Sequence, residues 1–257
     1  MLFLAVAIDM GLHSEAGITA HRESQAQKVL KTISDRMDLS VRYRMERLAA
    51  GVRALPNQLY VQSVLLTKLV DAVIRCGSLY YAQRLPKTLS KFSWRLDAKD
   101  VVATKYETLW QEIVGPSLQT ESLSKPLAQL DGADYSAFER FLGELPLPPE
   151  HLRPHVGSPN EAFAYMDIDA MLADLKFCNS ERFAGVQAVD MLASAVRRAC
   201  NGTIQPKGWK GIGRLMPRPE RGTHAVRFLE LEDSEPRDVS YAKYVREWDR
   251  ETKRMIV

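Results

Sequence analysis

Stretches with the pattern of β-strands alternate along this chain with stretches of helical periodicity, and this alternation limits the folds open to it. Strand-like runs occur at residues 2–8, 92–96 and 172–177. Apolar residues recur at helical spacing over residues 23–37, 59–74, 104–113, 135–142 and 183–200, and again from about residue 240. Strands that alternate with helices favour an α/β fold.

Local signals predict where several of these elements begin and end. Thr104 and Glu107 have the spacing of a capping box, which predicts the start of a helix, and Gly115-Pro116 predicts its end. Gly77 is expected to stop the helix that precedes it, and Asn201-Gly202 to close the helix over residues 183–200. Residues 41–55 are expected to form a short strand and a loop before Pro56.

The bulk composition is typical of a soluble globular protein. Hydrophobic residues make up 46% and charged residues 26% of 257 residues, enough for one large domain with an appendage. A main domain is expected over residues 1–221, with a proline-rich loop insertion at about 143–160. Residues 222–257 are expected to form a C-terminal extension with a helix.

Net charge and the number of cysteines indicate which partners and which cellular compartment are to be expected. The net charge is +3, so no overall field attracts the chain to nucleic acid or to an anionic membrane. Three scattered cysteines are typical of a reducing cytoplasm. The apolar run at residues 2–8 is stopped by Asp9, too early for a signal peptide or a membrane span. A cytoplasmic protein with no membrane partner is expected.

Two aspartates are the strongest candidates for chemistry. Asp97 follows a predicted strand, where ligands collect in open α/β sheets, although such a residue is also a common turn residue. Asp190 lies beside the apolar stripe of the helix over residues 183–200, so partial burial and a partner are expected. That partner is a metal ion, a helix cap or, in the simpler interpretation, a basic side chain. Carboxylates that converge on divalent ions can support phosphodiester hydrolysis.

A basic segment follows Asp190 in the sequence. Residues 197–221 contain seven basic residues and one glutamate. Basic side chains near an aromatic ring suit phosphate contact and base stacking, although a solvated surface explains them equally well. The predicted nucleic-acid contacts are Arg197, Arg198, Lys207, Trp209, Lys210 and Arg214.

Several well-known catalytic motifs are absent from the sequence. It contains no GxSxG nucleophile elbow, no GxxxxGK[ST] phosphate loop and no HExxH zinc motif. The five histidines are scattered, and no cysteines and histidines have the spacing of a zinc site.

The late helix carries a recognisable block, Gly185-Val-Gln187-Ala-Val-Asp190, preceded by Ser180. Other such blocks are Phe92-Ser-Trp-Arg-Leu-Asp97-Ala-Lys99-Asp100, Tyr106-Glu107-x-x-Trp110, Leu118-Gln119-x-x-Ser122 and Arg197-Arg198-Ala-Cys-Asn201-Gly202. Over roughly residues 55–215 these stretches resemble the domain-of-unknown-function 3800 family, whose most recognisable motif is the block on the late helix.

The resemblance implies an RNase H-like mixed sheet flanked by helices in residues 1–221, and a nuclease site that uses Mg²⁺ or Mn²⁺. Asp97 would match the family's acidic residue on a central strand, and Asp190 the one on the late helix. Lys99, Asp100, Ser180 and Gln187 would lie near them. The family's usual first strand, which ends in Asp-Glu-Ser-Gly, has no counterpart in this sequence. A site without that carboxylate is expected to bind metal poorly and to lose most of its rate.

Three functions follow as hypotheses. The first is a metal-dependent nuclease with Asp97 and Asp190 as metal ligands, inactive if the missing carboxylate is essential. The second is a nucleic-acid-binding module without catalysis. The third is a structural or interaction protein, such as a component of a mobile element or a defence system, in which both aspartates form ordinary ion pairs.

Overall fold

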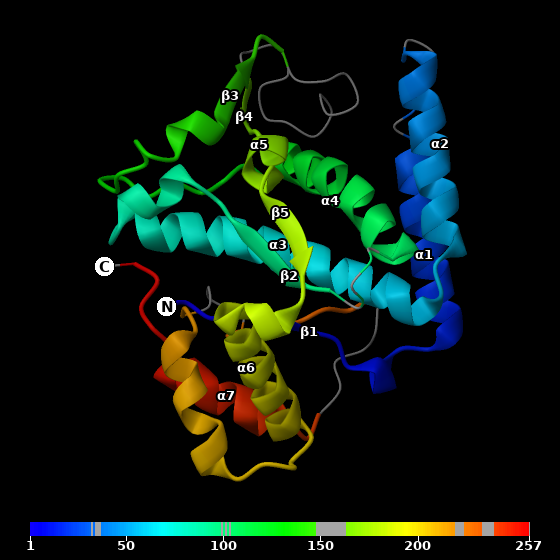
Figure 1. Cartoon of the computed structure of the whole chain (residues 1–257). Coiled ribbons are helices and arrows are strands. Elements are labelled where there is room, and N and C mark those ends of the chain that lie inside the picture. Colours follow the sequence, from blue (N-terminus) through cyan, green and yellow to red (C-terminus); the bar gives the residue numbers. More distant parts are fainter. Residues whose placement is uncertain are drawn as a thin grey trace.

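A computed structural model describes residues 1–31, 33, 37–98, 100, 102, 104–147, 163–218, 224–232 and 239–256 of the chain. It has a mixed α/β fold in which helices predominate (Figure 1). The described strands form three separate two-stranded sheets rather than the single mixed sheet expected. No helix among these residues is both long and apolar enough to cross a membrane.

Seven α-helices are found in the described part of the chain. They are α1 (Glu15–Lys31), α2 (Leu39–Ala54), α3 (Asn57–Ala82), α4 (Lys105–Ser124), α5 (Ile168–Leu172), α6 (Ala184–Cys200) and α7 (Ala242–Glu251). Short 3₁₀ turns join them, namely η1 (Met10–Leu12), η2 (Pro86–Ser90), η3 (Glu139–Phe141), η5 (Ser180–Arg182), η6 (Pro206–Gly208) and η7 (Lys210–Leu215).

Two of the three sheets are parallel pairs of strands far apart in the sequence. β1 (Ala5–Ala7) pairs with β6 (Val226–Phe228), and β2 (Trp94–Asp97) pairs with β5 (Leu175–Cys178). The antiparallel pair joins β3 (Leu142–Leu145) to β4 (Phe163–Met166). The predicted loop insertion lies between these last two strands, but it begins after β3, and its residues 148–160 lie outside the described residues.

Alternation along β2 and β5 explains which side chains this sheet buries. Trp94 and Leu96 of β2 pack into the larger core, and Phe177 of β5 meets Trp110 of α4 edge-to-face at a ring-centroid distance of 5.9 Å. Successive residues of a strand point to opposite faces. Asp97 therefore lies on the face away from that core.

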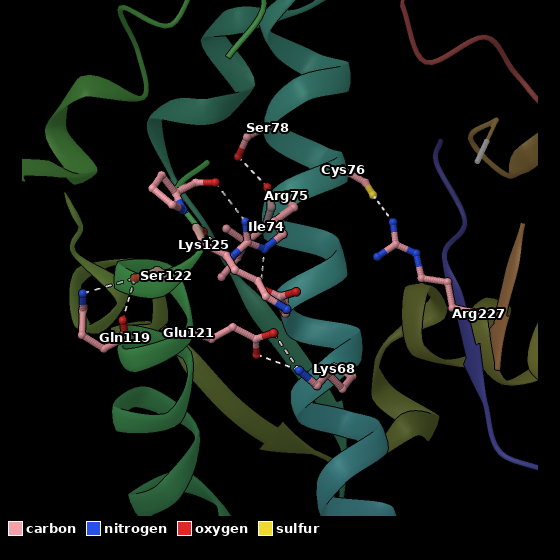
Figure 2. Close-up of polar contacts among 12 residues, drawn as sticks. Lys68, Ile74, Arg75, Cys76, Ser78, Gln119, Glu121, Ser122, Lys125 and Arg227 are labelled. Atoms are coloured by element: carbon pink, nitrogen blue, oxygen red, sulfur yellow. Dashed lines mark hydrogen bonds and ion pairs between the residues drawn. The ribbon is translucent and has the colours of Figure 1, made fainter. Parts of the chain in front are cut away.

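Polar contacts fasten α3 to α4 beside this core. Figure 2 shows Lys68 of α3 reaching Glu121 of α4, with a nitrogen–oxygen distance of 2.7 Å. Higher on α3, Arg75 donates to the carbonyl of Lys125 at 2.8 Å. The Arg75 bond satisfies the carbonyl of Lys125, the C-cap residue of α4, which has no partner within the helix.

A smaller core lies around α6 and α7, which Figure 1 shows together at one end of the molecule. Trp209 and Trp248 pack edge-to-face at 5.3 Å, and Val226 of β6 is fully buried beside them. Residues predicted to form a C-terminal extension thus supply a strand to β1 and a helix to this core. The predicted boundary at residues 221 and 222 lies outside the described residues.

The prediction of a strand and loop over residues 41–55 is wrong, because these residues form α2. Asp38 caps the helix by accepting the amide N–H of Ser40 at 2.8 Å. Leu48, Ala49 and Val52 are buried on one side of it. The helical spacing of these three residues, packed against α1, outweighs the β-prone residues at the start of the segment.

Two predicted helix stops are also wrong, for a common reason. α3 continues through Gly77 to Ala82, and α4 continues through Pro116 to Ser124. In both helices the residues beyond the predicted stop are buried, such as Ala82 of α3 and Leu118 of α4. Burial of an apolar side chain is worth about 1.5–3 kcal/mol, which offsets much of the cost of an internal glycine or proline.

Other boundaries agree more closely with the sequence. The Thr104–Glu107 capping box is present, with the Glu107 carboxylate accepting the Thr104 amide N–H at 2.6 Å. α6 ends at Asn201 as predicted, and Gly202 follows with a left-handed φ of 67°. That conformation suits glycine and closes the helix. α1 begins earlier than expected, whereas residues 135–142 form only η3 and the start of β3.

Candidate functional site

Asp97 is the last residue of β2, at the carboxyl edge of the parallel β2/β5 pair. It lies opposite Cys178 of β5, and the next residue, Ala98, donates its amide N–H to the Cys178 carbonyl at 2.9 Å. This bond fixes the backbone on which Asp97 is carried. The Asp97 side chain is exposed. Within the described residues no hydrogen bond or ion pair occupies its carboxylate.

The chain leads directly from this edge to the helix that carries Asp190. It passes from the tip of β5 through η5 into α6 (Figure 1). The side chain of Gln187 donates to the Glu181 carbonyl at 3.1 Å, so it fastens the first turns of α6 to η5. α6 also contacts β2. Both candidate aspartates are thus on elements that touch.

Asp190 is more exposed than its sequence position predicts. The apolar face of α6 is buried only in its second half, at Val196 and Ala199. In its first half Val189 keeps 52% and Met191 73% of its surface exposed, and Asp190 between them is exposed too. The expected partial burial of Asp190 is therefore wrong. No described residue forms an ion pair with it, so the predicted salt bridge is absent from this part of the chain.

The other residues predicted beside the two aspartates occupy varied positions. Ser180 opens η5, where its carbonyl accepts the Phe183 amide N–H at 3.0 Å. Asp100 is exposed three residues beyond the end of β2. Lys99 lies outside the described residues. The role that the structure gives Gln187 is to position α6.

The basic segment is divided by the fold. Arg197, Arg198 and Lys207 are exposed, and no ion pair holds them within the described residues. Lys210 and Arg214 instead pair with two carboxylates of α7, at 3.4 Å to Glu247 and 3.0 Å to Glu251. The acidic residues that offset this segment thus come from α7, which the sequence did not indicate.

The prediction that Trp209 stacks on a base is contradicted by its burial. Only 2% of its surface is exposed, and its ring packs edge-to-face against Tyr244 and Trp248. A ring enclosed in this way has no free face for a nucleobase. Its apolar bulk instead anchors η7 against α7.

The donor atoms present suit one divalent ion better than two. Mg²⁺ keeps several waters and is often held by one or two carboxylates together with substrate phosphates. Two exposed carboxylates satisfy that requirement if they converge. A site for two ions needs further ligands, and no group of three or more His, Cys, Asp and Glu residues in the described ranges could hold a metal.

Sequence reasoning missed a second strand edge with acidic residues. Asp9 follows β1 and Glu230 follows β6, and both line a cavity of about 240 Å³. The signal available was the one used for Asp97, a carboxylate directly after an apolar strand.

Comparison with models of known protein families, with curated proteins and with solved structures finds no match. The resemblance in sequence stays a prediction.

Proposed function

We propose that this protein is a divalent-metal-dependent phosphodiesterase of RNase H-like architecture that acts on nucleic acid, with Asp97 and Asp190 as its metal ligands. One observation carries the proposal. Two exposed carboxylates, without ion pairs in the described residues, lie on β2 and on the helix α6 that contacts it. The parallel β2/β5 pair followed by α6 supports the architecture.

The roles of the residues follow from their positions. Asp97 would hold a Mg²⁺ or Mn²⁺ ion from the strand edge, and Asp190 would hold it from the helix. When bound, such an ion supplies positive charge to a phosphate oxygen. Gln187 would act as a positioning residue, because its bond to the Glu181 carbonyl sets the rotation of α6 and hence the direction of Asp190. The exposed Arg197, Arg198 and Lys207 would contact the phosphate backbone.

The test is cleavage of labelled single- and double-stranded DNA and RNA with Mg²⁺ or Mn²⁺. Asp97→Asn and Asp190→Asn should each lower the rate by at least about 100-fold, because a neutral amide is a poor ligand for a hard cation. Both side chains are exposed, so thermal stability should stay within about 0.5 kcal/mol of the wild type.

Asp131→Asn is the matched control. This exposed aspartate lies in a turn and belongs to neither β2 nor α6, and its loss should leave cleavage unchanged. Undiminished cleavage by the Asp97→Asn, Asp190→Asn double variant would reject the assignment.

A second function, nucleic-acid binding without catalysis, is favoured by the exposed basic residues alone. Binding should weaken with salt, and Arg197→Gln with Lys207→Gln should lower the slope of log affinity against log salt by about 2. The pair Lys210→Gln and Arg214→Gln should lower it less, because α7 carboxylates already offset those charges. Equal effects of the two pairs would contradict this division of the segment.

A further inference from the structure

A cavity of about 240 Å³ lies at the carboxyl edge of the parallel β1/β6 pair. Asp9 and Leu12 line it from the turn after β1, Glu230 from the end of β6, and Tyr241 and Val245 from the start of α7. In open α/β sheets, ligands bind in the crevice outside the carboxyl ends of strands. The position of this cavity is therefore that of a binding site.

One wall of the cavity is aromatic and apolar. The rings of Phe228 and Tyr241 stack with centroids 4.7 Å apart and planes inclined at 15°. Leu12, Val239 and Val245 extend this wall. The surface suits a ring or a short hydrocarbon group, and aromatic faces also attract cations.

Two carboxylates, Asp9 and Glu230, are among the polar groups of the cavity. The Asp9 carboxylate is fixed by the amide N–H of Gly11, at 2.9 Å, and it bonds the Tyr241 hydroxyl. Burial, followed by the negative charge of Asp9, raises the pKa of Tyr241 to about 12, so the hydroxyl is a neutral donor. In the described residues, Asp9 and Glu230 have no ion pair, although Arg246 also lines the cavity.

A buried histidine lacks a hydrogen-bond partner there. His13 lines the cavity, and only 2% of its side chain is exposed. Its Nδ1 atom has no hydrogen bond within the described part of the chain, and the Glu232 carboxylate is 4.0 Å away, beyond hydrogen-bond range. Buried polar atoms are almost always satisfied, so this nitrogen points to a bound polar group.

We propose that this cavity binds a small organic ammonium ion that carries a single ring or a short apolar group. The ammonium would donate to Asp9 and to Nδ1 of His13, and the apolar group would pack on Phe228 and Tyr241. A cavity of about 150 Å³ is enough to hold benzene. The 240 Å³ found here leaves room for a ring and a short amine arm.

The test uses 2-phenylethylamine as the probe, with 2-phenylethanol and phenylacetate as neutral and anionic analogues of the same shape. Addition of the amine at pH 7 to the full chain should shift the backbone amide NMR signals of Leu12, Leu229 and Ala242, with a dissociation constant on the order of 1 mM. The alcohol should bind at least about fivefold more weakly, and the acid more weakly still. Equal binding of amine and alcohol, or no shift with the amine, would overturn the proposal.

Variants locate the charge that recognises the probe. Asp9→Asn keeps an oxygen that can accept the Gly11 amide N–H, so η1 should persist. Combined with Glu230→Gln it should weaken amine binding at least about tenfold, whereas Asp131→Asn should not change it. An unchanged affinity in the double variant would refute the proposal. MgCl₂ is titrated into the amine-bound protein, and displacement of the amine by Mg²⁺ would reassign the cavity to a metal ion and likewise refute the proposal.

Discussion

The two parallel strand pairs share one arrangement but differ in what covers it. Each carries an aspartate at or just beyond the carboxyl end of its first strand, Asp97 for β2 and Asp9 for β1. Tyr241 and α7 cover the β1/β6 edge and line the cavity there. At the β2/β5 edge Asp97 is exposed, and it does not line this cavity.

This difference shows that the element packed beside a strand-end carboxylate determines which ligands can reach it. At the enclosed edge, partial exclusion of water strengthens the electrostatic interaction of each charged group with a ligand. Such a space favours a small ligand that fills it. At the β2/β5 edge Asp97 is exposed, which contact with a long polymer such as nucleic acid would require. The two edges therefore support proposals for ligands of very different size.

The largest expected effect is on the stability of the enclosed side. Trp248 of α7 is fully buried, and its Nε1–H donates to the Trp209 carbonyl at 3.1 Å. Trp248→Ala should lower the free energy of unfolding by about 3–5 kcal/mol, through lost burial and the space left behind. Met191→Ala, on the open side, should change it by less than about 0.5 kcal/mol because Met191 is 73% exposed. Urea denaturation measures the free energy of unfolding of both variants. Similar losses of stability in the two would contradict the difference between the enclosed and the open side.

Substitution of two glycines, one on each side of the molecule, tests the same comparison with a smaller expected effect on stability. A Cβ atom at Gly213 would meet the Trp248 carbonyl oxygen at 3.0 Å, so Gly213→Ala should force η7 away from α7 and cost about 1–3 kcal/mol. A Cβ atom at Gly185, in the first turn of α6, meets nothing within 4 Å. Gly185→Ala should therefore stabilise the protein by about 0.5 kcal/mol. Thermal denaturation gives both values. A destabilising Gly185→Ala would mean that the open edge is covered.

The smallest effect is confined to high pH. The pKa of Tyr241 is raised from 10.0 to about 12 in the folded protein, by burial and then by Asp9. Between these values the unfolded chain loses the phenol proton first, so the free energy of unfolding should fall as pH rises. Tyr241→Phe should remove this part of the pH dependence. The difference in free energy of unfolding between the wild type and Tyr241→Phe should be constant from pH 7 to 9. By pH 11 it should have shifted in favour of the variant. A constant difference throughout would show that the Tyr241 hydroxyl is not enclosed.

Local signals predicted much of the fold. The Thr104 capping box, the strand that ends at Asp97 and the glycine closure of α6 at Gly202 each depend on a few neighbouring residues, and all are present. The failures at Gly77 and Pro116 arise because burial by distant elements outweighs a local stop signal. The three-residue pairing of β1 with β6 has no local signal that could reveal it.

The candidate site was predicted only as a pair of residue types. The sequence identified Asp97 and Asp190 by their places on a strand and a helix, but their exposure depends on how far along α6 the smaller core reaches. Burial of Trp209 by Tyr244, and the offsetting of Lys210 by Glu247, likewise require α7 to fold back on η7. Such contacts between distant segments are not encoded in local spacing.

The pairing of Ala5 with Val226 has a consequence for the growing chain on the ribosome. β1 leaves the exit tunnel early but gains its partner strand only after more than two hundred further residues have been made. Until then the backbone groups of β1 lack their partner strand, and the side chain of Phe3 lacks the Val226 and Trp248 residues of its core. Closing so long a loop is slow compared with local helix formation. We therefore expect the core around α3 and α4 to assemble before the half around α7.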